Sequence, residues 1–224
     1  MNWYVRDWAI EQCLAFFSLT QGDMEFIRSA HGVEWLMERY AANPATFYEE
    51  PLSILRQEIY HAQYSGAYHH PGFWLTVPPG GVVLDYGCGT AEVPRCPWIL
   101  RGGEYVGVET SSACLRYLRQ KYRQGNVLFL NGPEALCPDT GDGLLCDGLL
   151  CLDVLEHVSE PLALTAMLWD TLKVRGHALW RFSDAYPHPG HLRESIVQIP
   201  AWFEWLSKRS TIIEMDTFLW TMKR

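Results

Sequence analysis

The sequence lacks an excess of basic residues: 18 Lys and Arg stand against 26 Asp and Glu, which gives a formal net charge of −8 at pH 7. It also lacks any apolar run close to the roughly 18 to 20 residues that a membrane-spanning helix needs. The first absence counts against a nucleic-acid partner, because such binding depends on neutralising phosphates with cationic side chains. The second counts against a membrane protein. A cationic N-terminal stretch followed by an apolar one is also missing, so we expect no secretory signal peptide.

Paired cysteines are a further absence. The chain has seven cysteines, an odd number, and no two of them have the Cys-x-x-Cys spacing of a zinc or redox site. No segment resembles the nucleophile elbow of a serine hydrolase either. We therefore expect reduced thiols in a cytoplasmic protein, without a structural zinc site or a Ser-His-Asp triad.

The composition is that of a folded chain. The 224 residues are 48% hydrophobic and 20% charged, which is enough for a sizeable core and excludes a disordered chain. A cluster of turn residues at 78–81 divides the sequence into two patterns. We expect a helical N-terminal cap over residues 1–79 and a second domain over residues 80–224.

Helical spacing of apolar residues dominates the cap. It predicts a first helix around residues 5–16, a second over 26–40 after a cap at Asp23, and a third from Pro51. Met37 is expected on the buried face of the second. Three aromatic residues then recur every four positions: Tyr60, Tyr64 and Tyr68. This stripe is either packing between cap and sheet or a contact surface for a ligand, and Tyr64 is the candidate contact.

Short apolar runs alternate with helical patterns after residue 80. This alternation is typical of α/β proteins, in which helices connect parallel strands. We expect a Rossmann-like, mostly parallel seven-stranded sheet with helices on both faces and an antiparallel C-terminal strand. One helix is predicted from Pro161 to Gly176, and a terminal hairpin over 211–222 that turns at residues 216–217.

A strand that runs into a Gly-x-Gly turn is the most informative segment. Residues 82–84 are apolar, Asp85 follows, and the turn carries Gly87 and Gly89. Glycines let a ligand approach the backbone without meeting a Cβ atom. A dinucleotide site would want a small residue where Glu92 stands, and the Asp85 carboxylate would repel a phosphate. The pattern favours a cationic ligand.

The next strand ends in a second carboxylate. Glu109 comes 24 residues after Asp85, at a position where acidic side chains accept hydrogen bonds from ribose hydroxyls. The two carboxylates together predict a site for a nucleoside that carries a positive charge.

Three ordered motifs make the sequence similar to a known family. Residues 84–90, 106–109 and 150–158 resemble the class I S-adenosylmethionine-dependent methyltransferases, and the last resembles especially the small-molecule branch with the ubiquinone-pathway O-methyltransferases. The resemblance covers about residues 80–224. It implies S-adenosylmethionine as cofactor, with Asp85 and the glycine turn at the methionine moiety, Glu109 at the ribose and Thr110 beside the adenine. The family often has Asp-Ala where this chain has Asn131 and Gly132. The cofactor-binding residues that it implies, with our candidate from the cap, are Asp85, Gly87, Cys88, Gly89, Glu109, Thr110, Asn131, Gly132, Leu152 and Tyr64.

Catalytic candidates follow the fourth strand, where Asp153 and Glu156-His157 form an acid-x-x-Glu-His pattern. We predict Asp153 and His157 as catalytic residues, because an acceptor that must lose a proton needs a base. The same spacing is similar to a divalent-cation site in some family members, with His188 or His191 as a further ligand. We do not favour that alternative, since such a His is more often structural, and we predict no metal.

The function predicted is methyl transfer from S-adenosylmethionine to an oxygen, nitrogen or carbon atom of a small molecule. Two alternatives remain open. One is methylation of a macromolecule, either tRNA or a protein, although the negative charge counts against RNA. The other is a non-catalytic S-adenosylmethionine-binding module, whose cap would be a partner surface.

Overall fold

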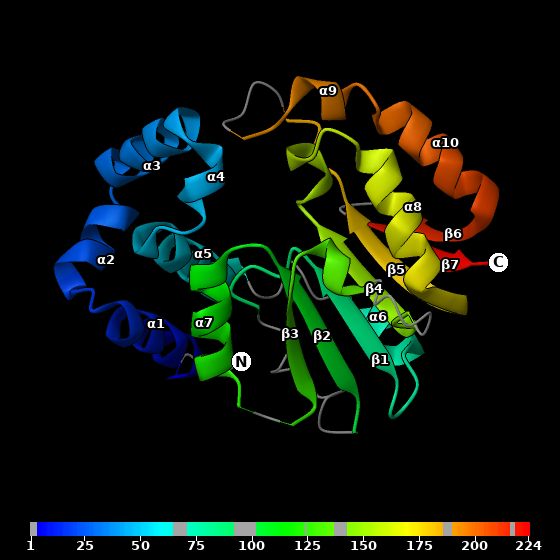
Figure 1. Ribbon diagram of the computed structural model, residues 1–224, viewed down its shortest axis with the longest axis horizontal. Helices are drawn as coiled ribbons and strands as arrows, with labels where there is room; N and C mark the ends of the chain where they lie inside the picture. The colour runs from blue at the N-terminus through cyan, green and yellow to red at the C-terminus, as the bar shows by residue number, and fades with distance from the viewer. Residues whose placement is uncertain are drawn as a thin grey trace.

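Seven strands form a single sheet in the described part of this computed structural model, in the order β3-β2-β1-β4-β5-β7-β6 (Figure 1). The structure describes residues 4–64, 71–91, 102–123, 125–136, 143–185, 190–215 and 218–224, with the backbone alone at 4–7, 44–45, 61–64 and 71. The strands are β1 Val82–Tyr86, β2 Glu104–Glu109, β3 Val127–Asn131, β4 Cys146–Leu152, β5 Leu172–Arg181, β6 Ser210–Met215 and β7 Leu219–Lys223.

Helices precede the sheet and connect its strands. The first six come before β1: α1 Tyr4–Phe17, α2 Gln21–Arg28, α3 Ala30–Ala42, α4 Pro44–Phe47, α5 Pro51–Tyr64 and α6 Pro71–Thr76. The others follow β2: α7 Ser112–Lys121, the 3₁₀ turns η3 Pro133–Leu136 and η4 Leu155–His157, α8 Pro161–Thr171, α9 Arg193–Ile196 and α10 Ile199–Arg209.

The strand pairing confirms the predicted fold class. Strand β1 pairs in parallel with β2 and β4, β2 pairs in parallel with β3, and β4 with β5, whereas β7 is antiparallel to both β5 and β6. The predicted C-terminal hairpin is therefore present, and its turn residues 216–217 lie outside the described part. The strand order reverses between β1 and β4, which is where ligands bind in open α/β sheets, at the carboxyl ends of the strands.

Both faces of the sheet are covered. Adjacent residues of β1 point to opposite faces, so that Val83 joins an apolar cluster with α1, α5 and α7, while Leu84 joins another with α8 and α10. Figure 1 shows α8 and α10 on one side of the sheet and α1, α5 and α7 on the other. The first cluster draws residues from the predicted cap and from the sheet together, and a division at residue 79 stays a prediction.

The second helix was predicted as one continuous helix over residues 26–40, and this prediction is wrong. Ser29 adopts an extended conformation, ends α2 and caps α3, because its hydroxyl accepts a hydrogen bond from the Gly32 N–H at 3.0 Å. The start also differs: Thr20 is the N-cap, and Asp23 completes a capping box by accepting from the Thr20 N–H at 2.7 Å. Met37 is exposed, contrary to our expectation, because the break rotates the buried face of α3 towards Leu36.

The predicted end of the helix that begins at Pro161 is also wrong. Helix α8 ends at Thr171, and the chain is already strand at Leu172, which pairs with Cys146 of β4. The register then shifts so that His177 lies opposite Gly148. Pairing with β4 outweighs the helical propensity of this segment, and Gly176 lies in the irregular part of β5.

The described residues can be compared with the sequence on two further points, membrane-spanning helices and the state of the cysteines. The longest described helices, α1 and α5, have 14 residues, and no described helix has the length and apolar character needed to span a bilayer. The five cysteines that lie in described segments are buried, unpaired thiols: Cys13, Cys88, Cys114, Cys146 and Cys151.

Candidate active site

The carboxyl edge of the parallel strands brings most of the predicted residues together. In register, Asp85 lies opposite Leu150 of β4 and Gly107 of β2, and Glu109 lies opposite Asn131 at the end of β3. Residues from four separate motifs therefore meet along one edge of the sheet, at the reversal of strand order between β1 and β4.

The turn after β1 exposes backbone rather than side chains. Gly87 has a φ of +71° and Gly89 a φ of +51°, in the left-handed region that favours glycine. A Cβ atom on Gly87 would lie 2.4 Å from Cγ2 of Val154, which follows β4. Between the glycines, Cys88 is buried and burial raises the pKa of its thiol well above the usual value. Cys88 is thus inert and offers only its backbone to a ligand.

Glu109 ties this turn to the start of α7. Its Oε2 accepts a hydrogen bond from the Gly89 N–H at 3.0 Å, while Oε1 accepts from the Thr110 and Ser111 N–H groups at 2.7 and 2.9 Å. Burial nevertheless raises the pKa of this carboxyl. The Thr110 hydroxyl also donates to Oε1, at 3.4 Å. Two carboxylate oxygens offer about four acceptor sites, so a ligand hydroxyl would take the place of this long bond.

A hydrogen bond from the neighbouring strand β2 orients the Asp85 side chain. Its Oδ2 accepts a hydrogen bond from the hydroxyl of Tyr105, which is fully buried on β2, at 2.7 Å. This bond fixes one oxygen of the carboxylate near the end of β1.

The other predicted contacts line this edge. Asn131 is exposed at the end of β3, and Gly132 has a φ of +72° and donates its N–H to the Glu109 carbonyl at 3.2 Å. Leu152 is half-buried at the end of β4. The side chain of Tyr64, residues 65–70 and His188 lie outside the described part, so the proposed aromatic stripe is not visible.

The N-terminal helical region contacts the carboxyl edge of the sheet through two residues, Tyr48 and Glu49, that the sequence analysis did not predict. Glu49 accepts hydrogen bonds from the N–H groups of Ser112 and Ala113 at 2.6 and 2.9 Å and thereby caps α7. Tyr48 is next to it, and its carbonyl accepts from the Ser111 hydroxyl at 2.7 Å. Burial raises the pKa of the Tyr48 hydroxyl, and Glu109 is among the charges that add to the shift. The cap thus borders the predicted ribose site.

Asp153, which directly follows β4, forms an ion pair with a residue of β5. It adopts a φ of +56°, and both of its carboxylate oxygens form an ion pair with Arg181, through Nε and Nη2 of the guanidinium at the end of β5. Two-point contacts of this kind fix the geometry of both partners. The sequence did not single out Arg181, because its partner is 28 residues away and only the β4–β5 pairing aligns them.

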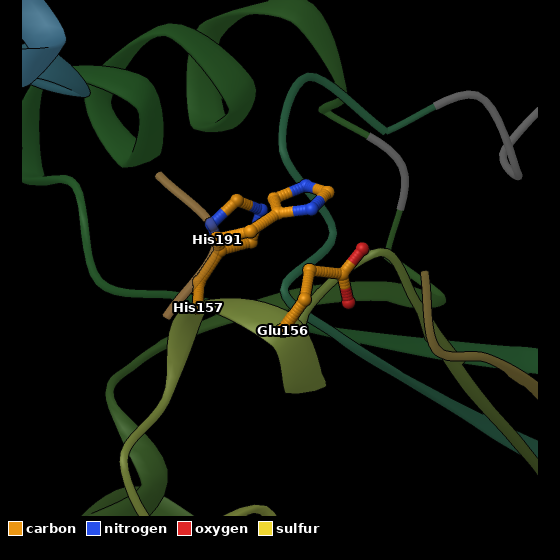
Figure 2. A group of neighbouring side chains, drawn as sticks. All are labelled: Glu156, His157 and His191. Atoms are coloured by element: carbon orange, nitrogen blue, oxygen red, sulfur yellow. The ribbon is translucent and has the colours of Figure 1, made fainter. Parts of the chain in front are cut away.

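Beside this ion pair, Glu156, His157 and His191 form a cluster (Figure 2). One ligating atom of each lies within 4.8 Å of the corresponding atoms of the other two. The Glu156 side chain is buried, and burial raises the pKa of its carboxyl to about 7, with the negative charge of Asp153 adding to the shift. The cluster joins η4 to the segment before α9, because the Leu192 N–H donates to the Glu156 carbonyl at 2.8 Å.

Known proteins resemble this chain in sequence. A family model described as a methyltransferase domain matches residues 84–180. A curated relative, the ubiquinone biosynthesis O-methyltransferase of Pasteurella multocida, is 30% identical in an alignment 107 residues long that covers 43% of this chain and 44% of the relative. The match therefore spans less than half the length of that protein.

Solved structures share the fold. A chain from a Haloferax volcanii complex of the Trm112 methyltransferase activator with a methyltransferase superposes with a TM-score of 0.56 at 17% identity, covering 80% of this chain and 78% of that one. A TehB-like S-adenosylmethionine-dependent methyltransferase of Corynebacterium glutamicum superposes with a TM-score of 0.52 at 14% identity, covering 78% and 100%. At these identities the likeness concerns the fold alone.

Proposed function

We propose, from the premise that residues 84–180 form a class I S-adenosylmethionine-dependent methyltransferase domain, that this chain transfers the methyl group of S-adenosylmethionine to a small molecule. The observation that carries the proposal is the position of Glu109, which links the glycine turn to the start of α7 at the carboxyl edge of the sheet. A nucleoside bound there would place its ribose on the carboxylate.

Different residues along this edge would bind different parts of the cofactor. In this proposal the backbone of Gly87, Cys88 and Gly89 and the Asp85 carboxylate hold the methionine moiety, since a carboxylate pairs with its ammonium group. Glu109 accepts from the ribose hydroxyls. Thr110, Asn131 and Gly132 flank the adenine. Thr110 follows Glu109 directly, and Asn131 ends β3 opposite Glu109, with Gly132 next to it.

The sulfonium and its methyl group would then lie near Leu152 and Asp153. Methyl transfer from a sulfonium needs alignment and exclusion of water more than it needs an activating group. Asp153 is engaged by Arg181, so we assign it a positioning role rather than the role of a base. His157 follows four residues later, where its Nδ1 lies 2.8 Å from the Gly190 carbonyl oxygen, and we propose it as the residue that contacts the acceptor.

A small acceptor is the best-supported choice. The relative named above is an O-methyltransferase of ubiquinone biosynthesis, which acts on a small molecule by its name. The net charge of −8 counts against binding to the phosphates of RNA. We propose methylation of an oxygen, nitrogen or carbon atom of a metabolite.

Release of S-adenosylhomocysteine from S-adenosylmethionine, measured by mass spectrometry across a panel of hydroxyl, amine and activated-carbon acceptors, tests this function. We expect product only with particular small acceptors. At S-adenosylmethionine concentrations below saturation, Glu109→Gln should give much less product, and Glu104→Gln, whose exposed carboxylate is at the other end of β2, should give as much as the parent. Methyl incorporation only into tRNA or protein fractions would contradict the small acceptor.

A further inference from the structure

We infer that Tyr122, which caps the C-terminal end of α7, is a positioning residue for the glycine turn, residues 87–91, together with Lys121 and Cys114 of the same helix. The inference rests on the proposed function, because it concerns how the chain shapes the backbone that would hold the cofactor. Figure 1 shows α7 beside the cap helix α5, so the same helix contacts the cap and the turn.

Three consecutive carbonyl groups of the glycine turn, those of residues 89–91, accept hydrogen bonds from α7 side chains. In the order of the accepting residues, the donors are the Cys114 thiol at 3.2 Å, Lys121 Nζ at 3.0 Å and the Tyr122 hydroxyl at 2.6 Å. All three donor residues are buried. Since a buried carbonyl that loses its donor carries a desolvation cost, these bonds restrict the conformation of the turn.

Ala91 depends most on such a partner. Its φ of +45° lies in the left-handed region, where an alanine side chain is strained. A strained conformation persists only when the surrounding contacts over-determine it. The Ala91 N–H donates to the Cys88 carbonyl at 2.9 Å, and the Ala91 carbonyl accepts the bond from Tyr122. Removing the Tyr122 hydroxyl therefore favours a relaxed conformation of the turn.

The N–H groups of the same turn are held from β2. The N–H groups of Gly87 and Cys88 both donate to the Val108 carbonyl, at 2.9 and 3.1 Å, and Glu109 accepts from Gly89. Strand β2 thus fixes donors of the turn, and α7 fixes its acceptors. A backbone that already has its binding conformation loses little conformational entropy when a ligand binds. Loss of the α7 contacts should therefore lower the affinity for the cofactor.

Tyr122 is the residue that isolates this role. Lys121 also pairs with Glu58 of α5 at 2.7 Å, so that its substitution breaks a buried ion pair as well as the bond to the turn. Tyr122→Phe removes one hydroxyl group and keeps the ring, which stacks on Phe129 with 6.0 Å between the ring centroids. The apolar packing of the end of α7 is then unchanged.

Tyr117→Phe is the matched control. The Tyr117 hydroxyl is also buried on α7 and also donates to a backbone carbonyl, that of Ala9 in α1, at 3.1 Å. Its other acceptor, Glu58, lies on α5. The control therefore removes a comparable hydroxyl whose two bonds join α7 to the cap rather than to the turn.

Calorimetric titration of the full-length chain with S-adenosylhomocysteine tests the inference. Tyr122→Phe should bind at least about 5-fold more weakly than the parent, because a buried acceptor without its donor reduces the fraction of chains whose turn is ready to bind. Tyr117→Phe should bind as the parent does. Thermal melting should show that both variants are folded.

Amide hydrogen exchange supplies a readout that a general loss of stability would not produce. In the free chain, peptides that span residues 86–91 should exchange faster in Tyr122→Phe than in Tyr117→Phe. Saturating S-adenosylhomocysteine should return their exchange to the rate of the parent, since the ligand then holds the turn.

A second pair of variants decides the question if Tyr122→Phe does not fold. Cys114→Ala and Cys146→Ala each remove a buried thiol that donates to a backbone carbonyl, at 3.2 Å to Gly89 and at 3.4 Å to Thr171. Only Cys114→Ala should lose affinity for S-adenosylhomocysteine, and the loss should be smaller than for Tyr122→Phe, because a thiol is a weak donor.

The outcomes separate this inference from the proposed function. Parent-like affinity and exchange in Tyr122→Phe, or an equal loss of affinity in Tyr117→Phe, would overturn the inference and leave the proposed function in place. For the second pair, equal affinity in Cys114→Ala and Cys146→Ala would do the same. A parent chain that does not bind S-adenosylhomocysteine would contradict the proposed function, and the inference with it.

Discussion

Gly87 lies in the turn that follows β1, and Glu109, at the end of the neighbouring strand β2, forms a hydrogen bond to the same turn. Gly87 supplies a backbone conformation at φ +71°, and Glu109 holds the Gly89 N–H at 3.0 Å. The sequence predicted both residues, because a glycine turn after an apolar strand and an acid at the end of the next strand are local patterns. It could not predict Tyr105 beneath Asp85, since a buried tyrosine in a strand is ordinary core packing until the register is known.

Gly87→Ala tests whether close packing at this turn matters for the ligand. The added Cβ would lie 2.4 Å from Val154, so we expect the turn to shift and affinity for S-adenosylhomocysteine to fall at least about 10-fold, a change of about 1.4 kcal/mol. Gly80→Ala is the matched control, because Gly80 has a φ of +72° with no atom within 4 Å of its would-be Cβ.

Calorimetric titrations of the two variants give the comparison. Gly80→Ala should lose about 1 kcal/mol of stability, because alanine is strained in the left-handed region. Gly87→Ala should lose more, because its Cβ also meets Val154. Only Gly87→Ala should lose affinity. Equal affinity in the two variants would mean that contact with Val154 is irrelevant to the cofactor site.

At the scale of elements, a buried ion pair joins α5 to α7. Lys121 Nζ lies 2.7 Å from both oxygens of Glu58 and donates to the Thr90 carbonyl at 3.0 Å, within the turn that follows β1. The Tyr117 hydroxyl also donates to Glu58, at 3.1 Å. The pair therefore connects the helical cap with the loop proposed to hold the cofactor.

Breaking this pair from one side should be strongly destabilising. Glu58→Gln leaves a buried ammonium without its counter-charge, and we expect urea denaturation to show a loss of about 3 to 5 kcal/mol. Lys121→Met should cost a similar amount. The double variant should lose clearly less than the sum of the two, because neither charge is then left alone.

Lys208→Met is the control for this series. It removes a lysine from the exposed pair with Glu204 on α10, and we expect no measurable change in the urea midpoint. Additive losses at Glu58 and Lys121 would show that the two side chains do not stabilise the fold as a pair.

Element boundaries were the least predictable feature of the sequence, and the reasons are physical. Ser29 interrupts an apolar pattern that is helical on both sides, and only its extended backbone and its bond to Gly32 show the break. The segment from Leu172 onwards has helical composition but pairs with β4, so a contact between distant segments decides its conformation. The N-cap of α7, by contrast, is a local feature, because the Ser111 hydroxyl accepts a hydrogen bond from the Cys114 N–H three residues later.

At the scale of the whole molecule, the alternation of strands and helices was sufficient to predict a mostly parallel sheet with an antiparallel C-terminal hairpin. The same reasoning placed the cofactor residues on one edge, since parallel strands end together. It missed Arg181 and Glu49, because each depends on contacts between segments far apart in the chain. For the same reason it named both His188 and His191 as candidates, and the structure places His191 beside Glu156 and His157.

The sequence also could not predict how the helical cap packs against the sheet. Residues from α1 and α5 share one apolar cluster with the sheet, and Tyr40 reaches the loop before α9 (Figure 1). The cap therefore borders both the proposed ribose site and the cluster of Glu156, His157 and His191.

Calorimetric titration of the full-length chain with S-adenosylhomocysteine tests the central claim most directly. We predict one equivalent bound by the parent and by Glu104→Gln, and an affinity about 10- to 100-fold lower for Glu109→Gln, which is the usual loss when hydrogen bonds to a charged group are removed. If the parent chain binds neither S-adenosylhomocysteine nor S-adenosylmethionine, or if Glu109→Gln binds as the parent does, the cofactor site is not where we place it.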